Sequence, residues 1–320
     1  MSTSRENIIL SSAHCGRDVP SRENIIPFLT ALDRESWGAI EEHTMSPQPL
    51  LPTVPFGPHQ VTRLIVGGNP FRGNSHFSPE LDREMRDYHT VENVVATLLR
   101  AQQCGINTMQ SRGDEIIFEI VRAFRDAGGA MHWFVQTASE MPDLFVNIRD
   151  IAALDPIGIY WHGSMTDRMW KKGRIDKAKD YLKAIRDTGK LVGIASHMPE
   201  VLRYIEAEGW DVDFYMVCLY NLSKIDRQSA IVTGKHVQEP FDDADRDLAC
   251  DFIRATAKPC IAYKALAASR KCTSEADIRA ALAFAYERIK PGDIIDIGVF
   301  QKHSDQVSTD ARIARDILGA

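Results

Sequence analysis

From about residue 60 to its end, the sequence alternates short apolar runs with longer amphipathic, charge-rich runs. A short apolar run is typical of a buried strand, and a longer amphipathic run is typical of a helix packed by one face. Their alternation predicts repeated βα units with a parallel sheet. We predict strands near residues 62–68, 105–109, 132–137, 157–162, 190–195, 213–219, 259–264 and 294–299. Helices are predicted near residues 91–103, 114–127, 142–152, 174–188, 199–208, 241–256, 274–289 and 304–317.

Eight successive βα units predict an α/β fold, a (β/α)8 TIM barrel, and 320 residues is an ordinary length for one such barrel. An open doubly wound sheet is the alternative architecture. Its glycine-rich GxGxxG turn follows none of the predicted strands, so the closed barrel is favoured.

Residues 1–58 depart from the repeat and are predicted to form an N-terminal extension that precedes a barrel domain over residues 59–320. The hexapeptide Ser-Arg-Glu-Asn-Ile-Ile occurs in it twice, at 4–9 and 21–26. The second copy leads into an amphipathic stretch, read as a helix, and then into a proline-rich linker at 46–58. We expect a peripheral arm or a contact between copies in a homo-oligomer rather than a catalytic role.

The composition argues against several classes of binding partner and cellular location. The net charge is −6 and no basic stripe stands out, which argues against nucleic acid. No apolar run approaches the length that spans a bilayer, and the N-terminus lacks the pattern of a signal peptide. The six cysteines are scattered without a CxxC pair, which favours reduced thiols in a cytoplasmic protein.

Several segments, taken in order, resemble one known family. Residues 52–71 resemble the hairpin and first strand that open the aldo/keto reductases, and the match continues through the barrel. The matching segments are Gly105-Ile106-Asn107-Thr108 with Gly113-Asp114-Glu115, Ile159-Tyr160-Trp161-His162, residues 193–200, Leu219-Tyr220-Asn221-Leu222 and residues 261–267. The resemblance implies carbonyl reduction by hydride transfer from NADPH, with an Asp, Tyr, Lys and His around the carbonyl.

The sequence departs from that family at the catalytic positions. The Asp, Tyr and Lys positions align with Asn107, Arg112 and Thr137, and only the His remains, as His162. Without a phenol whose pKa a lysine lowers, the family's proton donor is missing. The positions that hold the nicotinamide amide read Ala195, Ser196 and Val217. The resemblance leaves three cofactor-binding residues, namely Tyr263 to stack on nicotinamide, and Lys302 and Ser304 near the adenosine phosphate.

Polar residues nevertheless gather at the predicted carboxyl ends of the strands, where barrel enzymes carry out their chemistry. We expect substrate-binding residues at Asn69, Asp114, Gln136, Glu140, His197 and Asn221. Charged and amide groups at this density suit a small, oxygen-rich substrate such as a sugar or a sugar acid. The long segments 69–89 and 222–240 are expected to cover this end, with His76 as a further candidate.

Three groupings carry candidate chemistry. His162, His197 and Glu140 could hold a divalent metal, although separate hydrogen-bonding roles are the favoured interpretation because no metal-site spacing is present. Lys264 ends an apolar strand and is a candidate base or imine-forming nucleophile, or else a cation that binds a phosphate or carboxylate. Arg112 is a candidate for carboxylate recognition, or for a salt bridge to Asp114 or Glu115.

The predicted catalytic residues are therefore His162, Lys264 and Arg112. The first hypothesis is an aldo/keto reductase-like enzyme for a small polar carbonyl compound, with NADP as the cofactor. The second is a cofactor-free or metal-assisted lyase or isomerase for a keto-sugar or sugar acid. The third is a non-catalytic barrel that binds a ligand.

Overall fold

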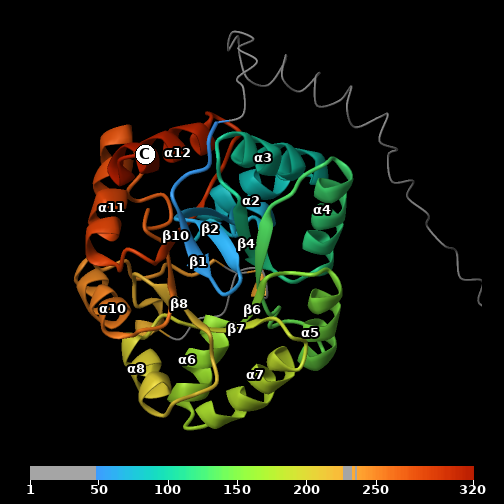
Figure 1. Ribbon diagram of the computed structural model, residues 1–320, viewed down its shortest axis with the longest axis vertical. Coiled ribbons are helices and arrows are strands. Elements are labelled where there is room, and N and C mark those ends of the chain that lie inside the picture. The colour runs from blue at the N-terminus through green and yellow to red at the C-terminus, as the bar shows by residue number, and fades with distance from the viewer. Residues whose placement is uncertain (1–47, 226–232, 235) are drawn as a thin grey trace, which may run out of the picture.

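The computed structural model describes residues 48–225, 233–234 and 236–320. Within these residues, eight parallel strands close into a barrel in the order β10-β3-β4-β5-β6-β7-β8-β9, and helices ring the outside (Figure 1). The chain is a (β/α)8 TIM barrel, as the alternating pattern predicts. The barrel strands are β3 (Leu64–Gly67), β4 (Thr108–Arg112), β5 (His132–Gln136), β6 (Gly158–Trp161), β7 (Leu191–Ser196), β8 (Phe214–Cys218), β9 (Cys260–Tyr263) and β10 (Ile294–Gly298).

The described helices follow the predicted positions closely, with two additions. The helices are α2 (Pro79–Tyr88), α3 (Val91–Gln103), α4 (Glu115–Asp126), α5 (Leu144–Ala153), α6 (Gly163–Lys171), α7 (Ala178–Arg186), α8 (Pro199–Ala207), α10 (Ala244–Ala255), α11 (Glu275–Arg288) and α12 (Gln306–Leu318). Short 3-10 turns are η1 (Pro70–Arg72), η2 (Ile175–Lys177) and η3 (Leu222–Lys224). The alternating pattern does not predict α2 and α6. Ser78 and Pro79 start α2 favourably, but its sequence is so rich in charge that it lacks an apolar run.

The second barrel strand was predicted too early. Strand β4 begins at Thr108, whereas the apolar pattern placed a strand at 105–109. Gly105 has a left-handed φ of 86° in the turn that follows α3, so the chain is not yet extended there. Asn107 lies before the strand, where its side-chain oxygen accepts a hydrogen bond of 2.9 Å from the Thr62 backbone.

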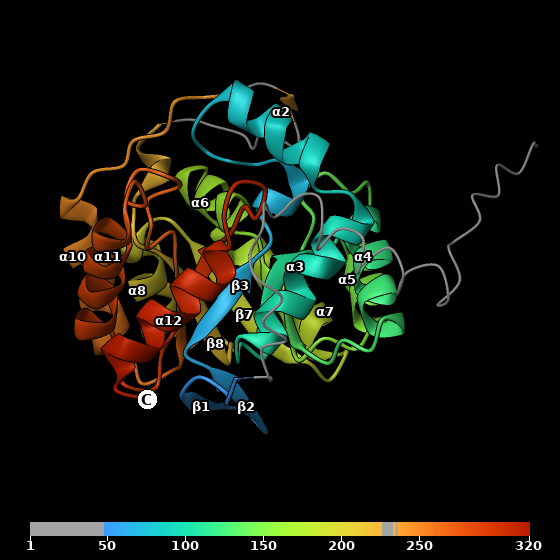
Figure 2. The same ribbon diagram turned by 90° about the horizontal axis from the view of Figure 1, so that it is seen from above.

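A small hairpin closes the amino-terminal end of the barrel. Strand β1 (Thr53–Phe56) pairs with β2 (His59–Thr62), and Gly57 supplies the positive φ of the turn between them. Phe56 packs against both Phe134 and Phe214, with ring centroids 4.9 and 5.3 Å away. Figure 2 shows this hairpin and α2 at opposite ends of the barrel.

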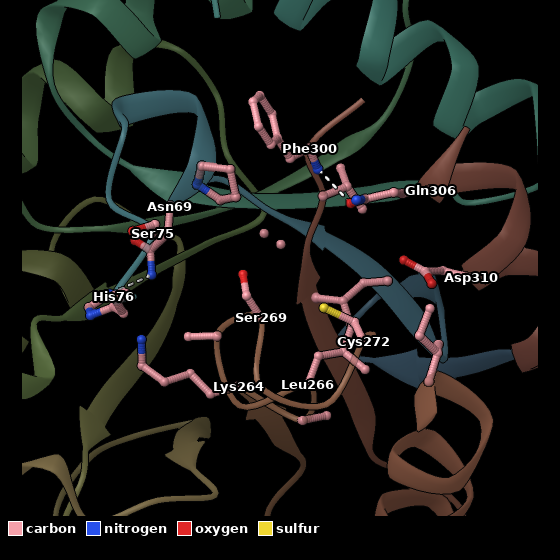
Figure 3. A pocket seen from close by; sticks show the side chains of 18 of the residues that line it. Asn69, Ser75, His76, Lys264, Leu266, Ser269, Cys272, Phe300, Gln306 and Asp310 are labelled. Atoms are coloured by element: carbon pink, nitrogen blue, oxygen red, sulfur yellow. Dashed lines mark hydrogen bonds between the residues drawn. The ribbon is translucent and has the colours of Figure 1, made fainter. Parts of the chain in front are cut away.

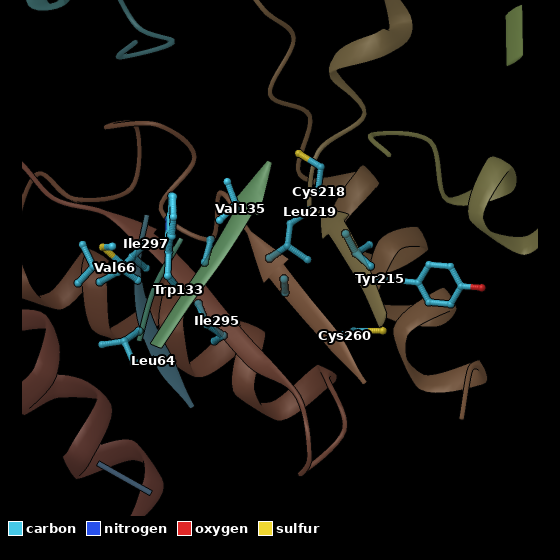
Figure 4. Close-up of a cluster of buried hydrophobic side chains, with 14 of the residues drawn as sticks. Leu64, Val66, Trp133, Val135, Tyr215, Cys218, Leu219, Cys260, Ile295 and Ile297 are labelled. Carbon is cyan, nitrogen blue, oxygen red and sulfur yellow. The ribbon is translucent and has the colours of Figure 1, made fainter. Parts of the chain in front are cut away.

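Outside the barrel, an apolar layer lies between the strands and the surrounding helices (Figure 4). It takes the alternate, outward-facing side chains of the strands, such as Trp133, Val135 and Ile295, all of which are buried. The Trp133 indole donates a hydrogen bond of 2.8 Å to the Ser111 hydroxyl, which satisfies its buried N–H. The inner faces of the strands are therefore separate from this layer, and they are available to build a site.

The segment before the hairpin is attached to the barrel. The backbone of Gln48 and Leu51 donates to the carbonyls of Gln103 and Gly105, and Leu51 is buried. The repeated hexapeptide, the predicted extension helix and the predicted oligomer contact fall on residues 1–47, which lie outside the described part of the chain. The division of the chain at residue 58 stays a prediction. None of the described helices combines the length and the apolar character needed to cross a membrane.

Candidate functional site

Side chains alternate along each strand, so every second residue faces the inside of the barrel. Near the hairpin, this inner face is apolar and includes Phe134, Phe214 and Ile294. Two residues further along the strands it becomes polar, with Gln136 after Phe134 and Asp296 after Ile294. The change from apolar to polar therefore marks the carboxyl end of the barrel as the site.

Gln110, Tyr160 and Gln136 form one hydrogen-bonded group across the inner face. The Gln110 amide donates to the Tyr160 hydroxyl at 2.5 Å, and this hydroxyl donates to the Gln136 side-chain oxygen at 3.4 Å. Burial raises the pKa of Tyr160 well above its usual value, and Asp296 adds to the rise when it is charged. Tyr160 therefore stays a neutral phenol that fixes the orientation of the two amides.

Asp296 is the most unusual group of this inner face. Its carboxyl is buried, and its Oδ1 atom has no hydrogen-bond partner among the described residues. Burial raises the pKa of Asp296 to about 8, and the positive charge of Lys264 limits the rise. Gly67 makes room for it, because a Cβ atom at that residue would lie 2.5 Å from Oδ1. The site thus holds a carboxyl group that can accept or give up a proton near neutral pH.

A cavity of about 530 Å³ opens beside this carboxyl (Figure 3). Asp296, Gln110 and Lys264 line the part that lies on the barrel axis. Cys272, Gln306 and Asp310 line the part that reaches between α11 and α12. A volume of this order holds a small organic molecule.

One wall of the cavity is a loop with an unusual backbone. Lys264, Ala267, Ala268 and Ser269 have positive φ angles of 66°, 51°, 48° and 71°. Each such angle costs a non-glycine residue about 1 kcal/mol or more, and strain of this kind concentrates at functional sites. Arg270 holds the loop in place, because its guanidinium donates to the carbonyl oxygens of Ala268 and His76, both at 3.1 Å.

A second polar cluster surrounds the buried carboxylate of Asp167 in α6. The His197 ring lies 2.7 Å from Oδ2, and the hydroxyls of Ser196 and Ser223 donate to the carboxylate at 2.5 and 2.6 Å. Burial alone would raise the pKa of Asp167, but these hydrogen bonds outweigh it and hold the pKa below its usual value. The cluster fixes His197 at the end of β7, where its ring meets the Tyr263 ring edge-on at 5.9 Å.

The structure separates the predicted site residues into two sets. Four line the cavity, namely Asn69, Tyr263, Lys264 and Ser304, and so does His76. The remaining predicted residues do not line it, and these are Arg112, Asp114, Gln136, Glu140, His162, His197, Asn221 and Lys302.

Several of the second set have structural partners. Arg112 is buried and forms ion pairs with Glu140 and, at 3.2 Å, with Asp114. Asp114 also caps α4 by accepting from the Ile117 backbone. Asn221 caps η3, and Lys302 pairs with Glu84 of α2 at 2.8 Å. The buried His162 is the N-cap residue that precedes α6, and it donates its backbone N–H to the Thr137 hydroxyl.

Three cavity residues that the sequence analysis did not single out are Gln110, Asp296 and Asp310. Asp296 had a sequence signal, because it is the one charged residue within the apolar strand Ile294–Gly298. Asp310 had none, because an aspartate in a helix with other charged residues ordinarily faces solvent.

The proposed equivalence between Asn107 and a catalytic Asp is wrong. Asn107 precedes β4, and its amide donates to the backbone of Gln60 in the hairpin, at the end of the barrel opposite the cavity. The grouping of His162, His197 and Glu140, which the sequence analysis weighed as a metal site without favouring it, is not assembled, since His197 pairs with Asp167 and Glu140 with Arg112. Within the residues that the structure describes, no three His, Cys, Asp or Glu side chains are placed to hold a metal ion.

The raised pKa of Asp296 predicts a measurable effect on stability. Between about pH 4 and pH 8, the folded state keeps a proton that the unfolded state has lost, so this group makes the fold less stable as the pH rises. Asparagine has no such penalty. We therefore expect the free energy of unfolding of Asp296→Asn to rise relative to that of the unsubstituted protein. The difference should grow by about 2 kcal/mol or more from about pH 5 to about pH 8. Urea denaturation of both proteins measures the difference, and a difference that does not change with pH would contradict the assignment.

Comparison with known proteins gives the fold and no family. No family model matches the chain, and no curated protein matches it in sequence. A mandelate oxidase bound to (S)-2-phenylpropionate is 12% identical with a TM-score of 0.50, over 94% of this chain and 86% of that one. An N-acetylmannosamine-6-phosphate 2-epimerase from Clostridium perfringens is 12% identical with a TM-score of 0.44, over 79% and 91%. An archaeal RuBisCO is 13% identical with a TM-score of 0.45, over 94% and 64%.

These findings correct the assignment to the aldo/keto reductases. The chain matches no family model of any kind, and the structure named above with a TM-score of 0.50 is a mandelate oxidase. At such low identity the likeness extends to the barrel fold alone. The chain is therefore a TIM barrel whose chemistry has to be argued from its own side chains.

Proposed function

We propose that this protein is an enzyme that moves a proton at the carbon next to the carbonyl group of a small polar substrate, as isomerases, epimerases and lyases do. The observation that carries the proposal is Asp296, a buried carboxyl with an unpartnered oxygen that faces the cavity and has a pKa raised to about 8. A group with such a pKa is well matched to proton transfer near neutral pH.

The reaction needs a base and a group that stabilises negative charge on the carbonyl oxygen. In its charged form, Asp296 accepts the proton from the carbon, and the electron pair of the broken C–H bond forms the double bond of the enol. Lys264, which lines the same cavity, donates a proton to the carbonyl oxygen. Return of the first proton to the opposite face of the same carbon, while Lys264 takes back its proton from the enol oxygen, completes an epimerisation. In a substrate with a hydroxyl group on that carbon, delivery of the proton to the former carbonyl carbon, while Lys264 takes the hydroxyl proton, completes an isomerisation.

Other cavity residues supply substrate contacts. The Asn69 and Gln110 amides and the Ser269 hydroxyl offer hydrogen bonds along the lining, which suits a hydroxylated compound such as a sugar or sugar acid. Tyr263 presents a partly buried ring at the same surface. The proposed mechanism assigns no role to a bound cofactor or metal.

Deuterium exchange tests the proposal without knowledge of the product. The protein is incubated in D2O with short-chain ketoses, aldoses and keto acids, and proton NMR follows the signal of the hydrogen next to the carbonyl. We expect this signal to disappear faster with protein than without it for at least one class. Ligand binding that causes no exchange in any of them would favour the non-catalytic barrel instead.

A further inference from the structure

The part of the cavity between α11 and α12 contains a second carboxyl group without a partner. Asp310 is 2% exposed, and its Oδ1 atom has no hydrogen-bond partner among the residues described. It belongs to the cavity lining, and Figure 3 shows it on the opposite side of the cavity from Lys264 and His76. A buried oxygen that lacks a hydrogen bond destabilises the fold, because its desolvation is not compensated. A ligand that donates a hydrogen bond to this oxygen would remove that free-energy cost.

The surroundings of Asp310 restrict what that partner can be. Leu266, Ile278 and Val299 contribute apolar walls, and none of the described residues that line the cavity is an arginine. Cys272 lies near Asp310, but burial raises the pKa of its thiol, and Asp310 adds to the rise, so it brings no charge. The walls therefore favour a ligand with an apolar body and one polar end.

The charges around this part of the cavity favour a positive end. Asp305 is paired with Arg100 and Glu275 with Arg312, both at 2.6 Å. Among the described residues, no cation pairs with Asp310, the third carboxyl of this group. Burial and the nearby Asp305 raise the pKa of Asp310 to about 7, and a cation bound beside it would lower this pKa again by stabilising the charged carboxylate.

We infer that the crevice at Asp310 is a binding subsite for a nitrogen cation, an ammonium or an amidinium group, carried on an apolar stem. Both groups donate charged hydrogen bonds to a carboxylate, and an amidinium can engage both of its oxygens. Because the same cavity reaches Asp296, the substrate would carry a carbonyl at one end and this cation at the other. That last step rests on the proposed function, whereas the binding of a cation does not.

Calorimetric titration with benzamidine and n-butylamine tests the subsite, with benzamide and n-butanol as uncharged comparisons. Benzamidine tests the amidinium group and n-butylamine tests the ammonium group. We expect one cation to bind more tightly than its uncharged counterpart, and Asp310→Asn to weaken that cation by about tenfold or more. Binding should also release protons near neutral pH, which appears as a heat that depends on the buffer.

Matched variants keep the outcome clear. Asp316→Asn changes an exposed aspartate of the same helix and should leave the affinity unchanged. Asp310→Asn should fold with an unchanged or higher melting temperature, because it removes a buried charge that has no partner. Equal affinity in the unsubstituted protein and Asp310→Asn would overturn the inference. Asp296→Asn should bind the cation with unchanged affinity but should no longer catalyse hydrogen exchange at the substrate carbon. The two measurements therefore test the subsite and the proposed chemistry separately.

Discussion

Asp296→Asn is expected to reduce protein-catalysed hydrogen exchange at the substrate carbon by about 10²–10⁴-fold, the range that a positioned acid or base contributes. Asparagine fills the same space between Gly67 and the cavity but cannot accept a proton from carbon. The fold should persist, because the replacement removes a buried carboxyl that lacks a hydrogen bond at Oδ1. Initial exchange rates measured by NMR, at a fixed substrate concentration, give the ratio.

Asp316→Asn is the matched control, because it makes the same chemical change on the outer surface, where Asp316 pairs with Arg279. It should retain the full exchange rate. An Asp296→Asn protein that exchanges as fast as the unsubstituted protein would show that another group takes the proton, and the proposed function would lose its principal support.

Phe56→Ala is expected to lower the free energy of unfolding by about 3–5 kcal/mol. The ring is 1% exposed and packs edge-on against Phe134 and Phe214 at the hairpin end of the barrel. The ring belongs to the close-packed apolar cluster inside the barrel, so its neighbours have little freedom to refill the space that the ring leaves. Urea denaturation near neutral pH measures the loss.

Phe145→Ala provides the comparison, because Phe145 is 46% exposed and stacks on Tyr181 at the surface. Phe145→Ala should lower the free energy of unfolding by much less than Phe56→Ala does. If the two variants lost the same free energy, the hairpin would not be a buried part of the barrel, and the account of its role would be wrong.

The sequence predicted the barrel because each strand is a short apolar run followed by a helix, and seven of the eight strands lie where that pattern places them. The exception is instructive. Residues 105–109 have an apolar pattern, yet Gly105 takes a left-handed φ and Asn107 bonds to the hairpin, so the strand begins at Thr108. A turn conformation and a contact between distant residues are not visible in local periodicity.

The site was predictable only in part. Lys264 and Asn69 follow strands directly, and the rule that barrel sites lie at the carboxyl ends of strands is enough to find them. Asp296 lies within a strand, and whether it faces inward depends on the closure and register of the whole sheet. Asp310 is buried by the packing of α12 beside the cavity, which no pattern within its helix reveals. Arg112 and Glu140 were expected at the ligand, but their opposite charges satisfy each other.

The loop from Lys264 to Ser269 has a thermodynamic consequence. Its left-handed backbone is established when the protein folds and is held by Arg270, so the wall is already shaped before any ligand arrives. Association then loses little chain entropy at this wall, and it requires little rearrangement. Substituting glycine at Ala267 or Ala268 would remove the local backbone strain and also make the wall more flexible. The variant would therefore have a less strained backbone and a lower affinity for the ligand.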